Sequence, residues 1–316
     1  MSDSGVLFLA RHWFEPRSEL AFVTRSLAAA TSRLHPVTVL APGAHGERIP
    51  DGGFDVVGAG REEPWLLPSG LAPRPAVIVD VVTPDVSARL AEIRPRMVCF
   101  LSSRGVPPSS WTPISAAGGR DGAIDVGLHV PVNTLAEQHR HHGFGFTGYQ
   151  LVLSGNVESS PNEPAPEVKE LGAAFPEDDI VVVGNGRARA WRAETLRGDV
   201  AVTTRMDLHR LLAHALFVVD LAPGRYLARE CVEALRFGTP ILVPTFARAA
   251  AEHARATGGG IFNDAEELIT AARRMHQASE RALTSEQGRR YADERYGRPE
   301  ALVARMDSLV AGTATA

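Results

Sequence analysis

The sequence predicts an α/β protein with two Rossmann-like, parallel-sheet domains. Two observations predict this class. Short apolar strands alternate with helices along the chain, as in a parallel sheet with crossover helices. The 316 residues are also enough for two domains of about 150 residues each. We expect residues 1–148 to form the first domain and residues 149–316 the second.

This boundary is predicted at a glycine-rich stretch in the middle of the chain. Residues 143–149 read GFGFTGY, which is typical of a hinge between domains. One alternative stays open. In another register, residues 149–154 would be the last strand of the first domain, and the boundary would then move to about residue 160.

The first domain is predicted to begin with a strand–helix–strand unit. An apolar strand at 6–10 leads into a polar turn, and Ser18 is placed to cap a helix that continues to Leu34. A strand at 37–40 follows, so we expect two parallel strands joined by a right-handed crossover. The other elements predicted here are a short strand near Val56 among the loops of 43–75, strands at 77–82, 97–101 and 124–132, and a helix at 85–93.

The second domain repeats the alternation. The predicted strands lie at 150–154, 179–183, 200–203 and 216–220, and the predicted helices at 164–174 and 207–215. Towards the C-terminus, Asn263 or Asp264 is placed to cap a helix, and a further helix is predicted at about 280–294. The tail from Gly312 is expected to fray.

The most informative stretch runs from 224 to 245. Its apolar residues fall on one stripe of a helix with 3.6 residues per turn, and they are Leu227, Cys231, Ala234 and Leu235. Gly238 can end this helix in a left-handed conformation, and Pro240 prevents its continuation. The apolar run at 241–243 is typical of a parallel strand that is buried on both faces.

The opposite side of this helix carries charge. Arg229, Glu233 and Arg236 recur at helical spacing. Taken alone, such a pattern indicates a solvated face with intrahelical ion pairs.

The order of helix, Gly-Thr-Pro and strand is also found in a known family of proteins. The segment VEALRFGTPIL, residues 232–242, resembles the C-terminal domain of retaining glycosyltransferases of the GT-B fold, glycosyltransferase family 4. HPVTVLAPG at 35–43 and VVVGNG at 181–186 resemble other segments of that family. The resemblance implies a GT-B fold, in which the two Rossmann-like domains face each other across a cleft and the last helix packs back on the first domain. It also implies transfer of a sugar from a nucleotide-sugar to an acceptor that the sequence does not identify.

The resemblance also implies site residues, although three charged family positions differ here. In the family, the residue at the position of Glu233 holds the ribose hydroxyls of the nucleotide. Arg225 replaces a glutamate, Asn156 replaces an arginine, and no lysine follows it in VESSPNEP. The residues expected to bind the donor are Gly155, Asn156, Gly184, Arg187, Arg225 and Glu233.

The remaining expected site residues lie mostly in the first domain. Arg104 and Ser102 belong to a polar loop tip beyond a predicted strand, where parallel sheets bind ligands. His129 matches a histidine that the family places near donor and acceptor, although a single histidine in a strand is often part of the core. The predicted catalytic residues are His129, Arg104 and Arg225, and those of the acceptor-side loop are His12, Arg17, Ser18 and Ser102.

Two explanations of the altered charges stay open. In the first, arginines at new positions bind the diphosphate, because a guanidinium group can contact a phosphate through two hydrogen bonds. In the second, transfer activity has been lost and the fold serves as a sugar-binding or partner subunit. A sugar epimerase or phosphorylase on the same fold is a further possibility. A dinucleotide enzyme is disfavoured, because GNGRAR at 184–189 lacks the third glycine of the usual fingerprint.

Composition excludes several other classes of function. A net charge of −4 and 6% aromatic residues argue against nucleic-acid binding. We expect no metal site, because His139, His141 and His142 lack a partner ligand at recognised spacing. No cofactor is expected beyond the nucleotide-sugar substrate. Two apolar cysteines, no signal peptide and no transmembrane run predict a cytoplasmic protein. Nothing in the sequence predicts the oligomeric state.

Overall fold

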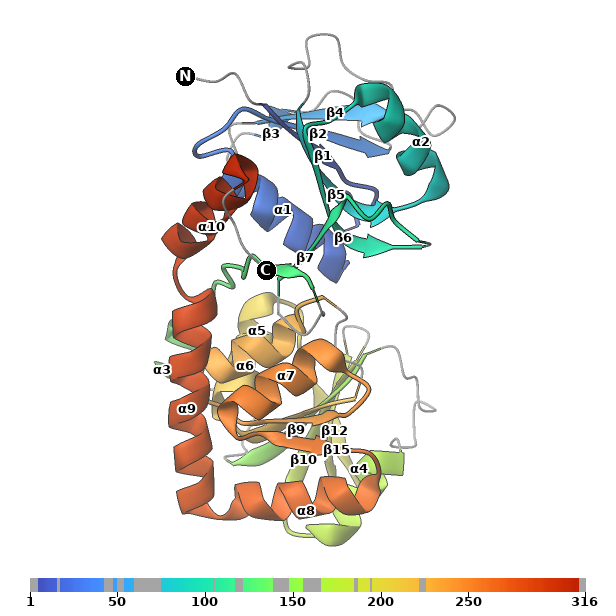
Figure 1. The fold of residues 1–316 in the computed structure, drawn as a ribbon. Coiled ribbons are helices and arrows are strands. Elements are labelled where there is room, and N and C mark those ends of the chain that lie inside the picture. The colour runs from blue at the N-terminus through green and yellow to red at the C-terminus, as the bar shows by residue number, and fades with distance from the viewer. Residues whose placement is uncertain are drawn as a thin grey trace. The chain divides into compact units, whose positions relative to one another are not determined.

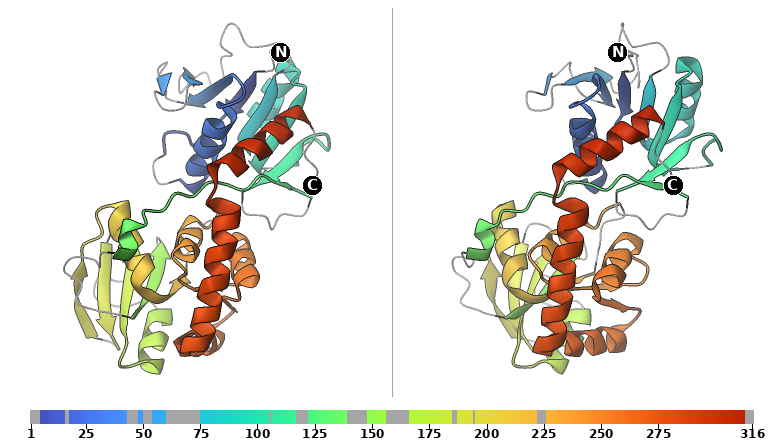
Figure 2. Two further views of the ribbon diagram at one scale, coloured as in Figure 1. Left: turned by 90° about the vertical axis from the view of Figure 1, so that its left-hand side faces the viewer. Right: turned by 60° about the vertical axis from the view of Figure 1, so that its left-hand side comes forward.

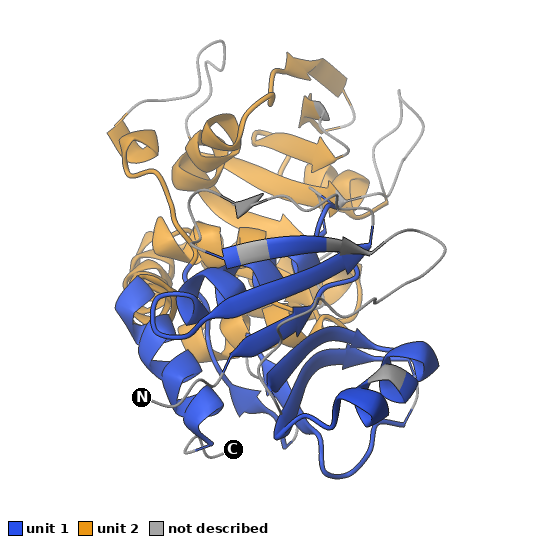
Figure 3. Ribbon diagram, turned by 90° about the horizontal axis from the view of Figure 1, so that it is seen from above, with its two compact units in different colours: residues 1–129, 298–316 blue, residues 130–297 orange. Residues whose placement is uncertain are grey.

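The chain divides into two compact units, which Figure 3 colours separately. Unit 1 comprises residues 1–129 and 298–316, and unit 2 comprises residues 130–297. The expected boundary at 148 therefore differs from this division, because residues 130–138 contact helices of unit 2. The computed structural model describes residues 5–15, 18–42, 48–49, 54–59, 75–104, 106–116, 122–138, 148–155, 166–184, 187–193, 195–221 and 226–312.

Unit 1 contains a mainly parallel sheet with strand order β3-β4-β2-β1-β5-β6-β7-β8 (Figure 1). Only β3 runs antiparallel to its neighbour among these strands. The strands are β1 (Val6–Leu9), β2 (Val37–Pro42), β3 (Arg48–Ile49), β4 (Phe54–Ala59), β5 (Ala76–Val82), β6 (Met97–Ser103), β7 (Thr112–Ser115) and β8 (Ile124–Asp125). Every residue of β5 is buried, as expected for a central parallel strand.

Helices cover the sheet of unit 1 and complete its core. Helix α2 (Pro84–Ile93) packs Val86 and Leu90 against the side chains of β1, β5 and β6. Helix α1 (Glu19–Thr31) begins where the sequence predicts, because the Ser18 side chain accepts a hydrogen bond from the Ala21 amide. Helix α10 (Pro299–Ala311) packs on α1, and His35 contacts Asp307 at 2.9 Å.

Two strand predictions in unit 1 need correction. The strand predicted at 124–132 is paired only at β8, and residues 126–133 continue without ladder partners. Gly127 has a φ of 61°, which turns the backbone out of the extended conformation, and Pro131 has no amide to donate. Strand β7 was not predicted, because Thr112 and Pro113 gave no apolar run.

Unit 2 contains a second sheet with strand order β12-β11-β10-β9-β13-β14-β15. The neighbours from β10 to β15 are parallel, and β11 and β12 form an antiparallel edge. The strands are β9 (Tyr149–Gly155), β10 (Asp179–Gly184), β11 (Arg187–Arg192), β12 (Thr195–Val200), β13 (Ala215–Asp220), β14 (Ile241–Pro244) and β15 (Gly260–Phe262). Together, the two sheets confirm the predicted class of two Rossmann-like α/β domains.

Helices lie on both faces of the unit 2 sheet (Figure 1). One face is covered by α4 (Pro166–Ala174) and α8 (Ala265–His276), whose apolar residues join a cluster with Phe217, Val219 and Leu242. The other face is covered by α5 (Arg205–His214), α6 (Arg229–Arg236) and α7 (Arg248–Thr257). The sandwich of a sheet between two helical layers buries the strands on both faces.

The edge hairpin of unit 2 is the main error in the prediction for this half. We expected one strand at 200–203, whereas the paired strands are β11 and β12 and residues 201–203 are loop. Ala188, Ala190 and Trp191 are buried in this hairpin. Its four arginines interrupt the apolar pattern that would have predicted the two strands.

The chain leaves unit 2 through a long helix. Helix α9 (Ala278–Tyr296) packs on α6, α7 and α8, and α10 follows it (Figure 2). It extends beyond the predicted 280–294 at both ends. No helix in the part of the chain that the structure describes combines the length and apolar character needed to cross a membrane.

Candidate functional site

The starts of α5 and α6 meet in unit 2, at the side of the sheet where ligands usually bind. Strand β9 lies between β10 and β13, so the chain proceeds to one side of β9 and then to the other. In open α/β sheets, ligands bind outside the carboxyl ends of the strands at such a reversal. Helix α6 begins after the carboxyl end of β13, and the first residue of α5, Arg205, contacts two glutamates of α6.

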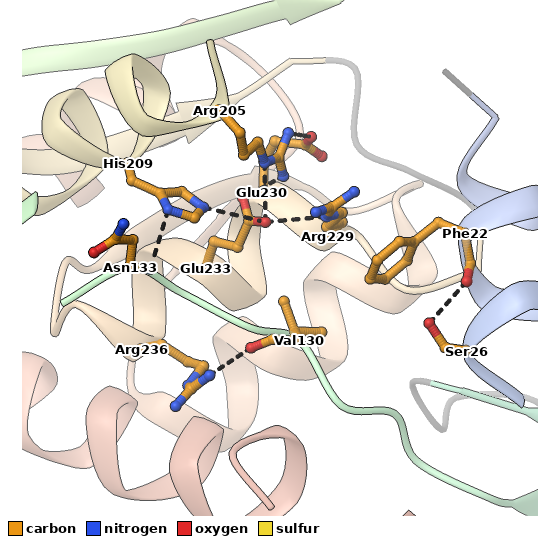
Figure 4. A network of polar contacts seen from close by, with 10 residues as sticks. All are labelled: Phe22, Ser26, Val130, Asn133, Arg205, His209, Arg229, Glu230, Glu233 and Arg236. Carbon is orange, nitrogen blue, oxygen red and sulfur yellow. Dashed lines mark hydrogen bonds and ion pairs between the residues drawn. The ribbon is translucent and has the colours of Figure 1, made fainter. Parts of the chain in front are cut away.

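A buried carboxylate forms the centre of this cluster. Glu233 has no exposed surface. Arg205 Nε and Arg229 Nε lie 3.1 and 3.0 Å from its Oε1 atom, and Arg205 Nη2 donates to Oε2. Arg205 Nη1 also donates to Glu230 Oε1 at 2.9 Å. Figure 4 shows both arginines and His209 directed at the Glu233 carboxylate. The charge pattern of this helix predicted that Glu233 would be exposed to solvent, and that prediction is wrong.

The surroundings keep Glu233 ionised. Burial by itself raises the pKa of Glu233, but contacts with His209, Arg205 and Arg229 outweigh it, so the pKa lies below its ordinary value. Burial lowers the pKa of Arg205, and the two glutamates more than offset this, so that pKa is raised. Since each charge is matched, the cluster holds two cations at fixed positions beside a helix start.

His209 joins the cluster to the extended segment 130–134. Its Nδ1 atom accepts from the Asn133 amide at 3.3 Å, which leaves the proton on Nε2. Nε2 lies 3.5 Å from Glu233 Oε1, which is long for a hydrogen bond and is better described as an electrostatic contact. An open depression of about 440 Å³ lies here, lined by Pro131, Val132, Asn133, Thr134, Arg205, His209 and Arg229.

The backbone before α6 adopts an unusual conformation. Ala228 has a φ of 52° and a ψ of 60°, and no side chain caps the helix that follows. A left-handed conformation costs a residue with a side chain roughly 1–2 kcal/mol. Such conformations persist only where the surroundings impose them, and they concentrate at functional sites. The strained residue directly precedes Arg229, one of the two cations on Glu233.

Three of the residues expected to bind the donor meet at the carboxyl edge of the unit 2 sheet. Gly155 ends β9 and Gly184 ends β10, and the two are paired after a register shift between Val183 and Gly184. Arg187 begins β11 and pairs with Gly184. Glu233 lies in the cluster described above. Asn156 and Arg225 lie outside the described residues, as do His139, His141 and His142.

In unit 1, the structure brings two of the expected residues to the end of β5. The His12 amide donates to Asp80 Oδ2 at 3.0 Å, and Ser102 pairs with Val81. The buried Asp80 holds the turn after β1, and burial raises its pKa. His12 Nδ1 also lies 2.8 Å from Glu15 Oε1.

The other expected residues of unit 1 lie apart from this pair or outside the described residues. Arg104 is exposed at the end of β6, His129 is half-buried, and Ser18 caps α1. Arg17 lies outside the described residues. The described residues contain no group of three or more possible metal ligands.

Arg205 and His209 were missed in the sequence. The available signal was the capping box from Thr204 to Asp207, in which the Thr204 side chain accepts from the Asp207 amide and the Asp207 carboxylate accepts from the Thr204 amide. It fixes the start of α5 at Arg205, and His209 then lies one turn further on the same face. Nothing local indicates that this face meets Glu233.

Comparison with known proteins identifies the fold. No family model and no curated protein sequence matches the chain. Solved structures do match. A sucrose-phosphate synthase from Thermosynechococcus elongatus superposes with a TM-score of 0.64 at 12% identity, over 98% of both chains. The E. coli trehalose-6-phosphate synthase bound with UDP-2-fluoro glucose gives 0.60 at 9% identity, over 98% of this chain and 99% of that one.

WaaG, a glycosyltransferase involved in lipopolysaccharide biosynthesis, gives a TM-score of 0.57 at 17% identity, over 97% of this chain and all of its own. At these identities the likeness establishes the fold, which is that of GT-B glycosyltransferases.

Proposed function

We propose that the protein is a retaining glycosyltransferase that uses a nucleotide-sugar donor and resembles glycosyltransferase family 4. The observation that carries the proposal is the cluster at the start of α6, where a buried glutamate holds two arginines at fixed positions. Its central residue, Glu233, lies within the segment 232–242 whose sequence resembles that family, on a fold shared with GT-B glycosyltransferases.

The chemistry of transfer calls for fixed positive charge. In this reaction the bond from the anomeric carbon to the diphosphate breaks, a bond to the acceptor oxygen forms, and a nucleoside diphosphate leaves. Preorganised cations stabilise the negative charge that develops on the leaving oxygen. Arg229 suits this role, since it lies at a helix start and lines the depression. Its Nε atom is bound to Glu233, which fixes the guanidinium plane without removing its charge.

Arg205 has a different part in the proposal. Its Nε and Nη2 atoms donate to Glu233 and its Nη1 atom donates to Glu230, so Arg205 neutralises these acids. Glu233 is then a positioning residue for Arg229. A direct contact between Glu233 and a ribose, as the family resemblance implies, would require this ion-pair cluster to open.

The remaining sequence-derived roles stay proposals. Gly155, Gly184 and Arg187 form the backbone edge that would approach the donor, and Asn156 and Arg225 would complete it. His12, Arg17, Ser18 and Ser102 would face the acceptor. Arg104, His129 and Arg225 would take part in transfer. No metal or further cofactor is invoked, and a cytoplasmic location is proposed from the apolar cysteines.

Binding is the first test. UDP-, GDP- and ADP-sugars are titrated against the protein while its melting temperature is followed. A donor at 100 times its dissociation constant stabilises a protein by about 2.7 kcal/mol. We expect one nucleotide class to raise the melting temperature. If none does, the proposed function is wrong.

A matched pair of variants then tests the role of Arg229. Arg229→Gln should weaken donor binding by at least about tenfold, the factor that corresponds to 1.4 kcal/mol. Arg273→Gln, which changes an exposed arginine on α8, should leave affinity unchanged. Equal affinity in the two variants would remove Arg229 from the donor site.

Assays of donor hydrolysis and sugar transfer distinguish an enzyme from a sugar-binding subunit. A protein that binds a donor, yet neither hydrolyses it nor transfers its sugar to any of a broad set of acceptors, would support the subunit alternative. Product analysed by NMR should keep the anomeric configuration of the donor. An inverted product would overturn the retaining assignment while leaving the transferase assignment intact.

A further inference from the structure

A buried histidine lies directly behind the strained residue at the start of α6. His253 belongs to α7 and has no exposed surface. Its Nε2 atom lies 2.9 Å from the Leu227 carbonyl oxygen, and its Nδ1 atom lies 3.0 Å from the Tyr291 hydroxyl. Leu227 and Ala228 are also fully buried. The ring therefore connects α9, through Tyr291, to the two residues that precede Arg229.

The partners determine the tautomer of the neutral ring. A carbonyl oxygen only accepts hydrogen bonds, so Nε2 carries the proton and donates to Leu227. Nδ1 is then the acceptor for the Tyr291 hydroxyl. The His253 ring also makes a tilted contact with the Tyr291 ring, at 5.8 Å between centroids, and an edge-to-face contact with the Tyr296 ring, at 5.6 Å. Arg295 lies over both tyrosine rings. Hence both the orientation and the tautomer of His253 are determined by its surroundings.

The hydrogen bond acts on the backbone directly before Arg229. The Leu227 carbonyl belongs to the peptide group that joins Leu227 to Ala228, the residue with the left-handed conformation. No side chain caps α6, and its first hydrogen bond from this turn runs from the Val232 amide to the Ala228 carbonyl at 3.1 Å. Holding the Leu227 carbonyl thus fixes the direction in which α6 begins, and with it the position of Arg229.

We propose that His253, oriented by Tyr291, is a positioning residue that holds the left-handed turn at Leu227–Ala228 and thereby places Arg229 for the donor phosphate. The expected effect on donor affinity rests on the proposed function. The expected effect on the conformation of Leu227–Ala228 does not. Since Tyr291 belongs to α9, the same contact links the placement of Arg229 to that helix.

Two substitutions separate the hydrogen bond from the bulk of the ring. In His253→Gln the amide nitrogen occupies roughly the place of Nε2 and can donate to Leu227. In His253→Asn the amide occupies the place of Nδ1 and cannot reach that carbonyl. If the turn of His253→Asn is competent in about one tenth of the molecules, its apparent affinity falls about tenfold. We expect that loss in His253→Asn, near-native affinity in His253→Gln, and an intermediate loss in Tyr291→Phe.

A backbone measurement keeps the proposal testable apart from ligand binding. Hydrogen–deuterium exchange of the Val232 amide should quicken in His253→Asn and not in His253→Gln. The Leu208 amide, which donates to Thr204 at the start of α5, is the internal control and should not change. Adding Ala228→Gly to His253→Asn should recover part of the lost affinity, because glycine adopts the left-handed conformation without strain.

The outcomes distinguish this proposal from the proposed function. If the unaltered protein binds no nucleotide-sugar, the proposed function fails, and exchange at Val232 alone decides whether His253 holds the turn. If the unaltered protein binds and the Asn and Gln variants behave alike in affinity and exchange, His253 has no positioning role. Should either variant fold poorly, Tyr291→Phe provides the same two measurements with the histidine in place.

Discussion

Helices α5 and α6 both begin with an arginine that contacts Glu233, but their starts are held in opposite ways. Helix α5 has a complete capping box, with Thr204 and Asp207 satisfying each other's backbone amides. Helix α6 starts from the strained Ala228 without a side-chain cap, and its preceding turn is bound by His253 from another helix. One start is thus encoded within four residues, and the other depends on a residue 25 positions further along the chain.

The start of α5 is held by residues of that helix, whereas the start of α6 is held by a residue of another helix. A local cap forms with the helix itself and is worth about 1 kcal/mol wherever the helix exists. A turn held from another element follows any movement of that element. Arg205, on the capped helix, is bound by Glu230 and Glu233, whereas Arg229, on the uncapped one, is the cation we assign to the donor. The start that is held from another helix therefore belongs to the arginine that we propose for the donor site.

The largest expected effect comes from removing the carboxylate that both starts share. Glu233→Gln leaves Arg205 and Arg229 without their buried counter-charge and should lower the free energy of unfolding by about 3 kcal/mol. This is the low end for breaking a buried pair, because both guanidinium groups retain some access to water. Chemical unfolding in urea measures it. Glu230→Gln, at a half-exposed site, should cost no more than about 1 kcal/mol, and equal losses would contradict a buried cluster.

The two helix starts should respond differently to substitution. Thr204→Ala removes the cap of α5 and should cost about 1 kcal/mol, while Thr204→Ser should retain most of it. Ala228→Gly should be close to neutral, because relief of the left-handed strain offsets the loss of a buried methyl group. Melting curves of the three variants make the comparison. A clear loss in Ala228→Gly would mean that the methyl group, and not the backbone, holds the turn.

Acid should lower the free energy of unfolding through protonation of Glu233, by less than Glu233→Gln does. The folded-state pKa of Glu233 lies below its ordinary value. Its contribution to stability is therefore fully present above the unfolded-state pKa of about 4.3, and it is lost as the pH falls through the folded-state value. Unfolding followed at successive pH values below 5 should show a steeper decline in the unaltered protein than in Glu233→Gln. Parallel curves would place the titrating group elsewhere.

The smallest effect is kinetic and concerns the two cysteines. Cys231 lies on the buried face of α6, with its thiol 3.2 Å from Asp220 Oδ2, and Cys99 is buried in β6. Burial raises the pKa of Cys99 to about 12, so it reacts slowly while folded. His253→Asn should speed alkylation of Cys231 and leave Cys99 unchanged, as peptide mass spectrometry would show. Equal acceleration at both sites would indicate global loosening instead.

The sequence was most informative where structure is local. The buried stripe of α6, its stop at Gly238 with a φ of 76°, and strand β14 follow from spacing and turn chemistry. The hairpin of β11 and β12 was missed because its four arginines interrupt the apolar alternation that marks a strand in the sequence. A strand was over-extended at 126–132 because apolar spacing does not reveal whether a neighbour is present to pair with it.

The site was predicted only in part for a related reason. Glu233 was selected from a resemblance, but its partners Arg205 and His209 come from a helix 20 or more residues earlier, and their meeting depends on how α5 packs on α6. His253 was not selected at all, since a single histidine on an alanine-rich helix gives no local signal. Packing between elements, not propensity within them, decides these contacts.

The packing of α10 on α1 determines which fragments of the chain can contain an intact unit 1. Because α10 completes unit 1, no contiguous fragment contains that unit whole without also containing unit 2. A fragment ending near His129 would leave the α10-facing side of α1 uncovered, and a stop codon after Gly297 would have the same effect. Complementation by a separately expressed C-terminal peptide, or a permuted gene that joins residue 312 to residue 5, would be the appropriate way to obtain unit 1 alone.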